Sequence, residues 1–350
     1  MEQTRILILY TGGTIGMGPK DPSKLNSPLI PQSWEQLQFY MPSIHPEGYF
    51  SKIKNIEFEY SAFDELLDSS QFDISHWAKM AEVIQHHYDN FDGFIIIHGT
   101  DTMAYTAAGL SFMFENLSKP VVLTGSQLPI SHSRTDAISN FSNAIHIAGA
   151  KAFSLPVINE VVICFNDRLF RGNRCTKAST NDFHGFISPN YLPLAELEES
   201  IRIKSHRVLP LPNGQFNVNY SLNPNVIVLT LFPGFQVKNL QKLIQDDEIE
   251  GLIIKTYGSG NAPASESFLS ALRQAKSQGT TILFTSQCLD GGVTLGKYEA
   301  SDVFLPIGVI SGGDMTSEAA LAKMMWVLGQ NGSEKEKEKM LQTSLRGEIS

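Results

Sequence analysis

The sequence has few cysteines and no long apolar run, and each absence excludes a class of protein. Only Cys164, Cys175 and Cys288 occur among 350 residues, and no two of them form a C-x-x-C pair. This pattern indicates neither a disulfide framework nor a thiolate metal site, and it fits a reducing compartment best. No apolar run approaches the roughly 18 residues that a membrane-spanning helix needs. The apolar stretch at the N-terminus is also too short for a signal-peptide core, so we expect a cytoplasmic protein that does not act at a membrane.

An excess of basic residues is absent as well. The chain has 27 Lys and Arg against 36 Asp and Glu, which gives a net charge of −9 and a pI near 5.5. Nucleic acid is therefore not expected as a partner, because phosphate binding needs a basic field. The histidines show no H-E-x-x-H or similar spacing, so we expect no metal. We expect no cofactor either.

Short apolar runs that end in glycine or polar residues alternate with longer helical patterns. The runs are residues 5–10, 94–99, 120–125, 160–165, 226–231, 251–258 and 281–286. Runs this apolar are typical of strands buried on both faces of a parallel sheet. Between them, the pattern predicts helices within 75–91, 103–117 and 264–279. The alternation predicts an α/β fold, with a larger N-terminal doubly wound parallel-sheet domain and a smaller C-terminal α/β domain.

The stretch 191–225 interrupts this alternation. The surrounding region is rich in proline and carries a charged patch at 196–204. We interpret 191–225 as a linker between an N-terminal domain (1–190) and a C-terminal domain (226–350).

Polar residues follow many of the predicted strands. They are residues 11–14, 99–102, 125–127, 166–168, 258–261 and 286–288. Ligands of open α/β sheets bind beyond the carboxyl ends of the strands, so these residues are the candidates for a site. Thr14 and Thr100 at two strand ends, with Asp101 and Lys177, suit nucleophilic acyl chemistry, in which a neutral lysine activates a hydroxyl.

Each of these residues also has a simpler interpretation. Residues 11–14 could form a phosphate-binding turn, although neither G-x-G-x-x-G nor the P-loop pattern is present. Thr100 to Thr102 could serve as a helix N-cap. Lys177 taken alone would be a surface lysine, and His98 a packing or hydrogen-bonding residue. From the residues alone, the sequence predicts an α/β enzyme with a small polar ligand, and a threonine nucleophile is one option.

Motifs along the whole chain go further. They are YTGGTIGM (10–17), DSS (68–70), HGTDTMAYTA (98–107), VVLTGSQLP (121–129), RGNRCTKAS (171–179), TYGSGNAP (256–263) and GGDMTSEAALAK (312–323). In these motifs and their order the sequence resembles the bacterial-type L-asparaginases, and among them the cytoplasmic type I enzymes. The resemblance implies hydrolysis of L-asparagine to L-aspartate and ammonia through a threonine-linked acyl-enzyme. It also implies a homodimer or homotetramer, with sites formed between subunits.

The resemblance assigns roles to individual residues. Thr14 corresponds to the primary nucleophile, and Thr100, Asp101 and Lys177 to a second catalytic set. Asp68, Ser69 and Ser70 fall in the stretch where relatives hold the α-carboxylate of the substrate, and Asp101 where they hold its α-ammonium group. Asn261 corresponds to a residue that reaches the site from the neighbouring subunit.

Two features depart from the family pattern. Many relatives carry a tyrosine shortly after the nucleophile, but residues 17–30 contain none. Tyr298 lies in a segment where some type I enzymes place a tyrosine, so we expect Tyr298 to replace it. Some type I enzymes also bind asparagine at an effector site, which here would include Thr176, Lys255 and Cys288. Lys255 stands where an arginine is expected, and lysine lacks the fork that holds a carboxylate through two bonds.

Rival functions remain open at this level. One rival is a related amidase that acts mainly on glutamine. Glutamine is one methylene longer than asparagine, and a binding pocket discriminates one methylene by only about 1–3 kcal/mol. A tRNA-dependent amidotransferase subunit is disfavoured by the acidic charge and by the position of Thr14 near the N-terminus. A non-catalytic asparagine-binding protein would not need both threonines and the lysine.

Overall fold

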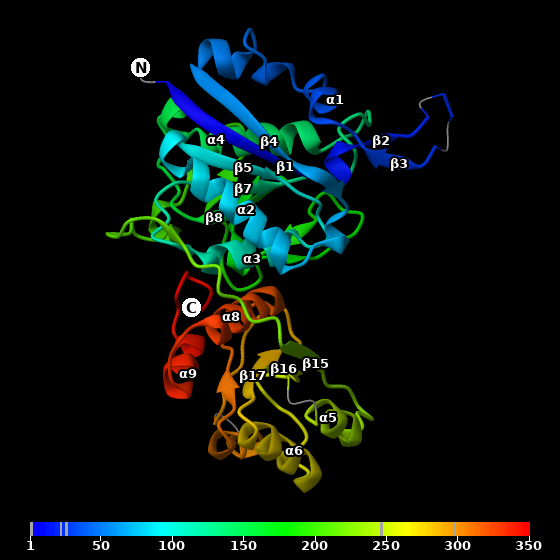
Figure 1. The fold of residues 1–350 in the computed structure, drawn as a ribbon, viewed down its shortest axis with the longest axis vertical. Coiled ribbons are helices and arrows are strands. Elements are labelled where there is room, and N and C mark those ends of the chain that lie inside the picture. The colour runs from blue at the N-terminus through cyan, green and yellow to red at the C-terminus, as the bar shows by residue number, and fades with distance from the viewer. Residues whose placement is uncertain (1–2, 22, 25–26, 246–247, 297–298) are drawn as a thin grey trace. The chain divides into compact units, whose positions relative to one another are not determined.

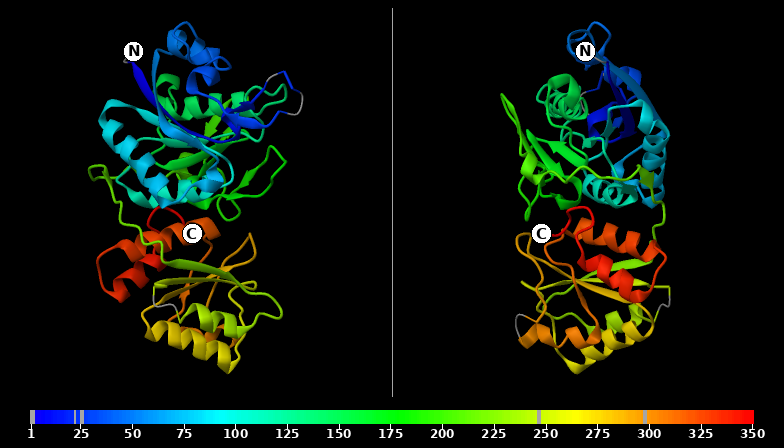
Figure 2. Two further views of the ribbon diagram at one scale, coloured as in Figure 1. Left: turned by 45° about the vertical axis from the view of Figure 1, so that its right-hand side comes forward. Right: turned by 90° about the vertical axis from the view of Figure 1, so that its left-hand side faces the viewer.

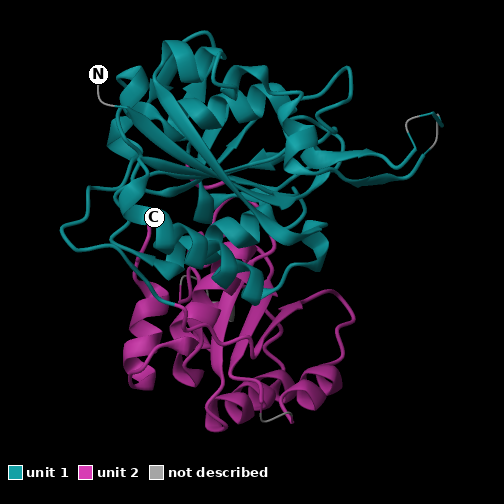
Figure 3. Cartoon of the chain, turned by 45° about the horizontal axis from the view of Figure 1, so that its top comes forward, with its two compact units in different colours: residues 1–188, 192–219 teal, residues 189–191, 220–350 magenta. Residues whose placement is uncertain are grey.

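The computed structural model describes residues 3–21, 23–24, 27–245, 248–296 and 299–350, and the chain divides into two compact units (Figure 3). Unit 1 is Met1–Ser188 with Leu192–Asn219, and unit 2 is Pro189–Tyr191 with Tyr220–Ser350. Each unit contains a mainly parallel sheet with helices packed on it. The predicted α/β class, with a larger N-terminal and a smaller C-terminal part, is confirmed.

The sheet of unit 1 has eight strands in the order β13-β12-β9-β8-β7-β5-β1-β4. Their bounds are β1 Thr4–Gly12, β4 Ile56–Leu67, β5 Gly93–Ile97, β7 Val121–Thr124, β8 Val161–Phe165, β9 Arg168–Arg171, β12 Ala195–Leu197 and β13 Ile201–Ile203. From β4 to β8 the neighbours are parallel, whereas β9, β12 and β13 add an antiparallel edge. The carboxyl ends of β4, β1, β5 and β7 therefore meet at one edge of the sheet.

Helices cover both faces of this sheet, as a doubly wound fold requires (Figure 1). They are α1 Trp34–Gln38, α2 Ile74–His87, α3 Met103–Met113 and α4 Ala137–Ala148. In Figures 1 and 2, α1 and α4 lie on one side of the sheet, and α2 and α3 lie on the other. Short pairs of strands complete the unit: β2 Met17–Pro19 with β3 Leu29–Pro31, β6 Phe114–Glu115 with β14 Asn217–Val218, and β10 Thr176–Lys177 with β11 Phe186–Ile187.

Helix α2 shows how the apolar spacing becomes structure. The Asp73 side chain accepts a hydrogen bond from the backbone N–H of Ser75 and caps the first turn. Trp77, Met80 and Ile84 recur on one face, and each is no more than 6% exposed. Full burial of such side chains stabilises the fold by roughly 1.5–3 kcal/mol each. The predicted helix face is thus the one that packs.

Unit 2 is built around a four-stranded parallel sheet in the order β15-β16-β17-β18. Its elements are β15 Val226–Thr230, β16 Gly251–Thr256, β17 Thr281–Ser286, β18 Ile310–Ser311, α5 Val237–Leu243, α6 Glu266–Ser277, α7 Glu299–Asp302, α8 Ser317–Gly329 and α9 Glu334–Gln342. Within the unit, α5 and α6 lie on one side of the sheet and α8 lies on the other (Figure 1). The strands predicted at 226–231, 251–258 and 281–286 are confirmed.

Two features of unit 1 were not among the expected strands. Strand β4 alternates polar and apolar residues, because it is the last strand of the sheet and is only partly covered. In the range interpreted as a linker, residues 192–219 belong to unit 1 and contain β12, β13 and β14. These strands are two or three residues long, too short to leave a periodic signal. Over the described residues, no helix has the length and apolarity to cross a bilayer.

Candidate active site

The loop after β1 carries Thr14 and begins with two glycines in unusual conformations. Gly12 and Gly13 have φ values of 114° and 87°, a region that favours glycine. A Cβ atom on Gly13 would lie only 2.4 Å from the Cα atom of Gly99. This close approach seats the loop of Thr14 directly on the backbone that follows β5. Thr14 then opens a short 3-10 turn, Thr14–Gly16.

The loop after β4 packs into the same place. A Cβ atom on Gly99 would lie 2.6 Å from Oγ of Ser69, and the Thr102 hydroxyl donates to the Ser69 carbonyl at 2.7 Å. Because β4, β1 and β5 are neighbours in the sheet, their carboxyl-end loops adjoin. Thr14, Ser69 and Thr100 are therefore carried by three contiguous loops.

Lys177 reaches this edge from the β10–β11 hairpin. Its Nζ atom lies 2.9 Å from Oγ1 of Thr100 and 2.5 Å from Oδ1 of Asp101. The Lys177 side chain is 18% exposed and the Asp101 side chain 58%, while Thr100 is 6% exposed. Lys177 is thus not a surface lysine, and the structure brings the predicted second catalytic set together.

The N-cap interpretation of residues 100–102 is not supported by a side-chain bond. Thr102 occupies the N-cap position of α3, but it makes no side-chain capping hydrogen bond to the helix. Its hydroxyl instead joins the loop to Ser69. The polar residues of this turn therefore tie loops together rather than cap the helix.

Asp68 and Ser70 shape the end of β4. The Asp68 carboxylate accepts a hydrogen bond from the backbone N–H of Ser70 at 2.9 Å and begins the turn Ser69–Gln71. Hydrogen bonds from Ser70, with a smaller contribution from the charge of Lys177, lower the pKa of Asp68 below its ordinary value. The ionised form of Asp68 is thus favoured, and the charge of Lys177 contributes to this.

Gln127 and Asp136, which have no predicted role, also support this edge of the sheet. The backbone N–H groups of Gln127 and Leu128 donate to the Asp136 carboxylate. The Gln127 amide donates to the carbonyls of Ser179 and Asp182, at 3.3 and 2.8 Å, in the turn of the β10–β11 hairpin. Gln127 therefore joins the end of β7 to the hairpin that carries Lys177. Its position directly after a predicted strand was the only sequence signal.

His98 directly follows β5 and is a buried hydrogen-bonding residue. This agrees with the simpler interpretation of His98 from the sequence. Its ring nitrogens lie 2.6 Å from the Gly99 carbonyl and 2.9 Å from the Thr106 hydroxyl. Burial lowers the pKa of His98 from 6.5 to about 4. The ring is thus neutral at neutral pH and fixes the backbone that precedes Thr100.

The shift predicts a pH-dependent stability. Between pH 6.5 and pH 4 the unfolded chain binds a proton at His98 that the folded chain does not bind. The stability that depends on neutral His98 is complete above pH 6.5 and is lost as the pH falls to 4, by on the order of 3 kcal/mol. We expect His98→Gln to remove this part of the slope. Denaturant unfolding of both proteins at several pH values measures it, and equal slopes would contradict the prediction.

Other predicted residues lie in unit 2. Lys255 is in β16, and Asn261 closes a tight turn by pairing with Tyr257. Cys288 follows β17, is exposed, and its backbone N–H donates to the Ser286 hydroxyl at 3.0 Å. These three residues lie at or near the carboxyl ends of the unit 2 strands.

Two further predicted residues lie elsewhere. Thr176 belongs to unit 1, where it is paired with Ile187 next to Lys177. Tyr298 falls outside the described residues. Among the residues described, no group of His, Cys, Asp and Glu is arranged to hold a metal ion.

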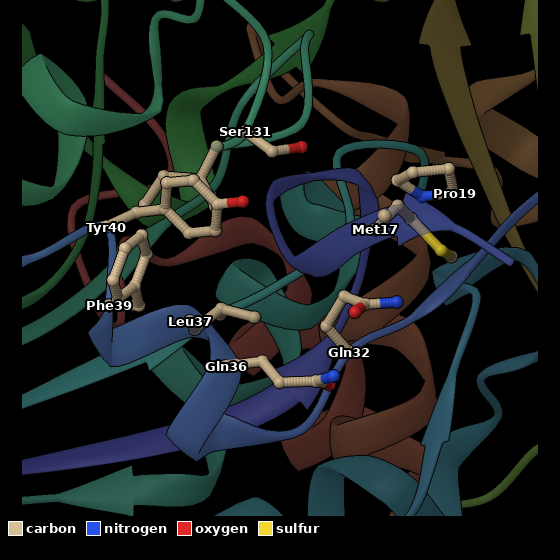
Figure 4. Close-up of a pocket in the computed structure, with 10 residues that line it drawn as sticks. Met17, Pro19, Gln32, Gln36, Leu37, Phe39, Tyr40 and Ser131 are labelled. Carbon is tan, nitrogen blue, oxygen red and sulfur yellow. The ribbon is translucent and has the colours of Figure 1, made fainter. Parts of the chain in front are cut away.

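A cavity of about 430 Å³ adjoins the nucleophile loop from β2 and α1 (Figure 4). Gln32 and Gln36 lie next to each other in its wall, and the rings of Phe39 and Tyr40 pack edge to face with their centroids 5.5 Å apart. The backbone of Gln32 donates to the carbonyl of Gly16 at 2.8 Å. None of the residues that line this cavity is a predicted site residue.

Comparison with known proteins identifies the family. The family model described as "Asparaginase, N-terminal" matches residues 5–209, and "Glutaminase/Asparaginase C-terminal domain" matches 225–341. The chain is 39% identical to L-asparaginase 1 of Escherichia coli K12 over 100% of this chain and 99% of that protein. It is 37% identical to the mouse 60 kDa lysophospholipase, over 99% of this chain and 63% of that protein.

Among solved structures, L-asparaginase I of Vibrio cholerae O1 matches with a TM-score of 0.88 and 39% identity, over the full length of both chains. The two matched domains and the full-length similarity to named asparaginases assign the chain to one family. This chain belongs to the asparaginase family of amidohydrolases.

Proposed function

We propose that this protein hydrolyses the side-chain amide of L-asparagine to L-aspartate and ammonia, with Thr14 as the nucleophile. One observation carries the proposal. Lys177 Nζ lies 2.9 Å from the Thr100 hydroxyl, on a loop whose backbone packs against the loop of Thr14. Two threonines and a lysine at one sheet edge suit a two-step acyl transfer.

In the first step, Oγ1 of Thr14 attacks the carbon of the side-chain amide. The hydroxyl proton passes to the amide nitrogen, which leaves as ammonia, and an ester joins Thr14 to the acyl group. The developing oxyanion requires donors fixed in advance, and backbone N–H groups near Thr14 and Thr100 can supply them. The close contact of Gly13 with Gly99 fixes these two loops against each other.

In the second step, water attacks the ester carbon and restores Thr14. Thr100 and Lys177 together accept a proton from that water. To do so, the pair must first have released a proton or share one between its two side chains. Asp101, 2.5 Å from Lys177 Nζ, orients the ammonium or amine group. The proton then returns to Oγ1 of Thr14 as aspartate is released.

Substrate binding completes the proposal. Ser69 and Ser70, beside Asp68, take the α-carboxylate through hydroxyl and backbone donors, and Asp101 takes the α-ammonium group. Asn261 of a second copy completes the site, so the active form is a homodimer or homotetramer, and the protein is cytoplasmic. The family resemblance supports these assignments.

The proposal is tested by measuring ammonia and aspartate released by the purified protein from asparagine, with glutamine in a parallel assay. Release from asparagine at a higher kcat/KM than from glutamine supports the assignment. Preference for glutamine would reassign the substrate, and binding of asparagine without ammonia release would indicate a non-catalytic protein.

Two finer proposals use the same assay. Tyr298 activates Thr14, and unchanged turnover in Tyr298→Phe would remove it from the mechanism.

Thr176, Lys255 and Cys288 form an effector site for asparagine. A sigmoidal rate curve supports that site, whereas a simple hyperbola argues against it.

A further inference from the structure

The segment 345–350 folds back onto the sheet of unit 2. It follows α9 and ends on the loop 312–316, which comes directly after β18. The backbone N–H of Ser350 donates to the Asp314 carboxylate at 3.0 Å. A Cβ atom on Gly313 would lie 3.1 Å from a methyl group of Ile349. The segment therefore rests on a carboxyl-end loop, where ligands of such sheets bind.

A fully buried ion pair holds the segment in place. Nζ of Lys323, on α8, lies 2.5 Å from the Glu348 carboxylate, and both side chains are 0% exposed. Lys323 also donates to the carbonyls of Leu341 and Thr343, at 3.0 and 2.6 Å. Glu348 accepts hydrogen bonds from the backbone N–H groups of Leu345 and Arg346. Buried charges persist only when paired and hydrogen-bonded in this way, so the pair fixes one conformation of the segment.

The loop 312–316 is bonded in turn to the loop after β17. The Asn190 amide donates to the carbonyls of Asp314 and Gly291, each at 3.0 Å, and its oxygen accepts from the N–H of Gly291 at 2.8 Å. The backbone N–H of Val293 donates to the Gly313 carbonyl at 2.9 Å. Asn190 thus joins two carboxyl-end loops that are separate in sequence.

From there the bonding continues to the turn of Asn261. The Ser286 hydroxyl accepts from the N–H of Cys288 at 3.0 Å and donates to the Gly258 carbonyl at 2.7 Å. Gly258 lies in the turn that Asn261 closes on Tyr257. Hydrogen bonds, packing contacts and the short backbone segments between them therefore connect Glu348 with Asn261 inside unit 2.

We propose that Glu348, Lys323 and the segment 345–350 are positioning residues for asparagine, which hold the unit 2 loops in the conformation that Asn261 needs. The inference rests on the proposed function, because that function alone gives Asn261 contact with substrate. Gly258, Gly291 and Gly313 have positive φ values, and glycine backbones are costly to order. Bonds that order these loops before substrate arrives lower the entropic cost of binding.

The test is Glu348→Gln, which keeps the shape of the side chain and removes its charge. Coupling through such networks corresponds to about 2–30-fold in affinity. We expect KM for asparagine to rise by about tenfold and kcat to change by less than about twofold, because Thr14 and Lys177 are untouched. Steady-state kinetics of the full chain measure both.

The matched control is Glu338→Gln. Glu338 on α9 pairs with Lys276 on α6 at 3.0 Å, and over the described part of the chain this pair has no bond to the loops 257–261, 286–293 and 312–316. We expect parental KM from this variant. A rise in KM equal to that of Glu348→Gln would overturn the inference, because any weakening of α9 would then suffice.

Three further variants separate positioning from stability. Lys323→Met with Glu348→Met removes both buried charges, so the melting temperature recovers relative to Glu348→Gln. KM stays high, because Leu345 and Arg346 lose their acceptor. As a single variant, Asn190→Ala also raises KM. The double variant of Asn190→Ala and Glu348→Gln raises KM by less than the product of the two single effects, as expected for residues of one network.

The outcomes distinguish this inference from the proposed function. A lower melting temperature with parental KM in Glu348→Gln and Asn190→Ala would make the pair purely structural and overturn the inference, while asparagine hydrolysis stands. Absence of asparagine hydrolysis in the parent protein would overturn both.

Discussion

Replacing Thr14 by alanine is expected to abolish ammonia release from asparagine, with a fall in kcat of on the order of 10⁴–10⁶-fold, as for other covalent nucleophiles. The physical reason is the loss of the hydroxyl oxygen that forms the ester in the proposed mechanism. Folding should be little affected, because Thr14 is half-buried at the start of a short turn. Initial-rate ammonia assays and melting temperatures of both proteins measure the two quantities.

Thr14→Ser is the matched control. Serine keeps the hydroxyl and loses only a methyl group, so it should retain measurable turnover and form the same ester. Mass spectrometry of a reaction quenched in acid would place the added acyl mass on the peptide that contains residue 14. Full activity in Thr14→Ala, or acylation elsewhere, would exclude Thr14 as the nucleophile.

Lys177→Met is expected to lower kcat by about 10²–10⁴-fold, the range typical of a lost general acid or base. Methionine keeps much of the length of the side chain but accepts no proton and cannot hold Thr100. Thr100→Val should cause a similar loss. The double variant should be little worse than either single one, because Thr100 and Lys177, in contact at 2.9 Å, act as one unit.

The control for Lys177 is another ion-paired lysine of unit 1. Lys151 pairs with Asp92 at 2.6 Å but is 63% exposed and belongs to no predicted site. We expect Lys151→Met to keep parental kcat. Losses at Thr100 and Lys177 that multiply fully would show independent roles, and normal turnover in Lys177→Met would remove the lysine from the mechanism.

Much of the α/β architecture was predictable because its signal is local. Strands buried on both faces appear as apolar runs such as 94–97, whatever their neighbours are. The same runs end in polar residues, so Thr14 and Thr100 were among the candidates for a site at the carboxyl edge, and the family resemblance assigned their roles. Strand β4 was not predicted, because an edge strand need not be apolar throughout.

Tertiary structure alone decided which of these residues meet. Lys177 and Thr100 are 77 positions apart, and their contact depends on the β10–β11 hairpin and its tie through Gln127. The buried pair of Lys323 and Glu348 likewise forms only when the segment after α9 turns back on the sheet. Such contacts depend on strand order and on the path of the chain between elements. Local periodicity encodes neither of them, because it records only which face of each element is buried.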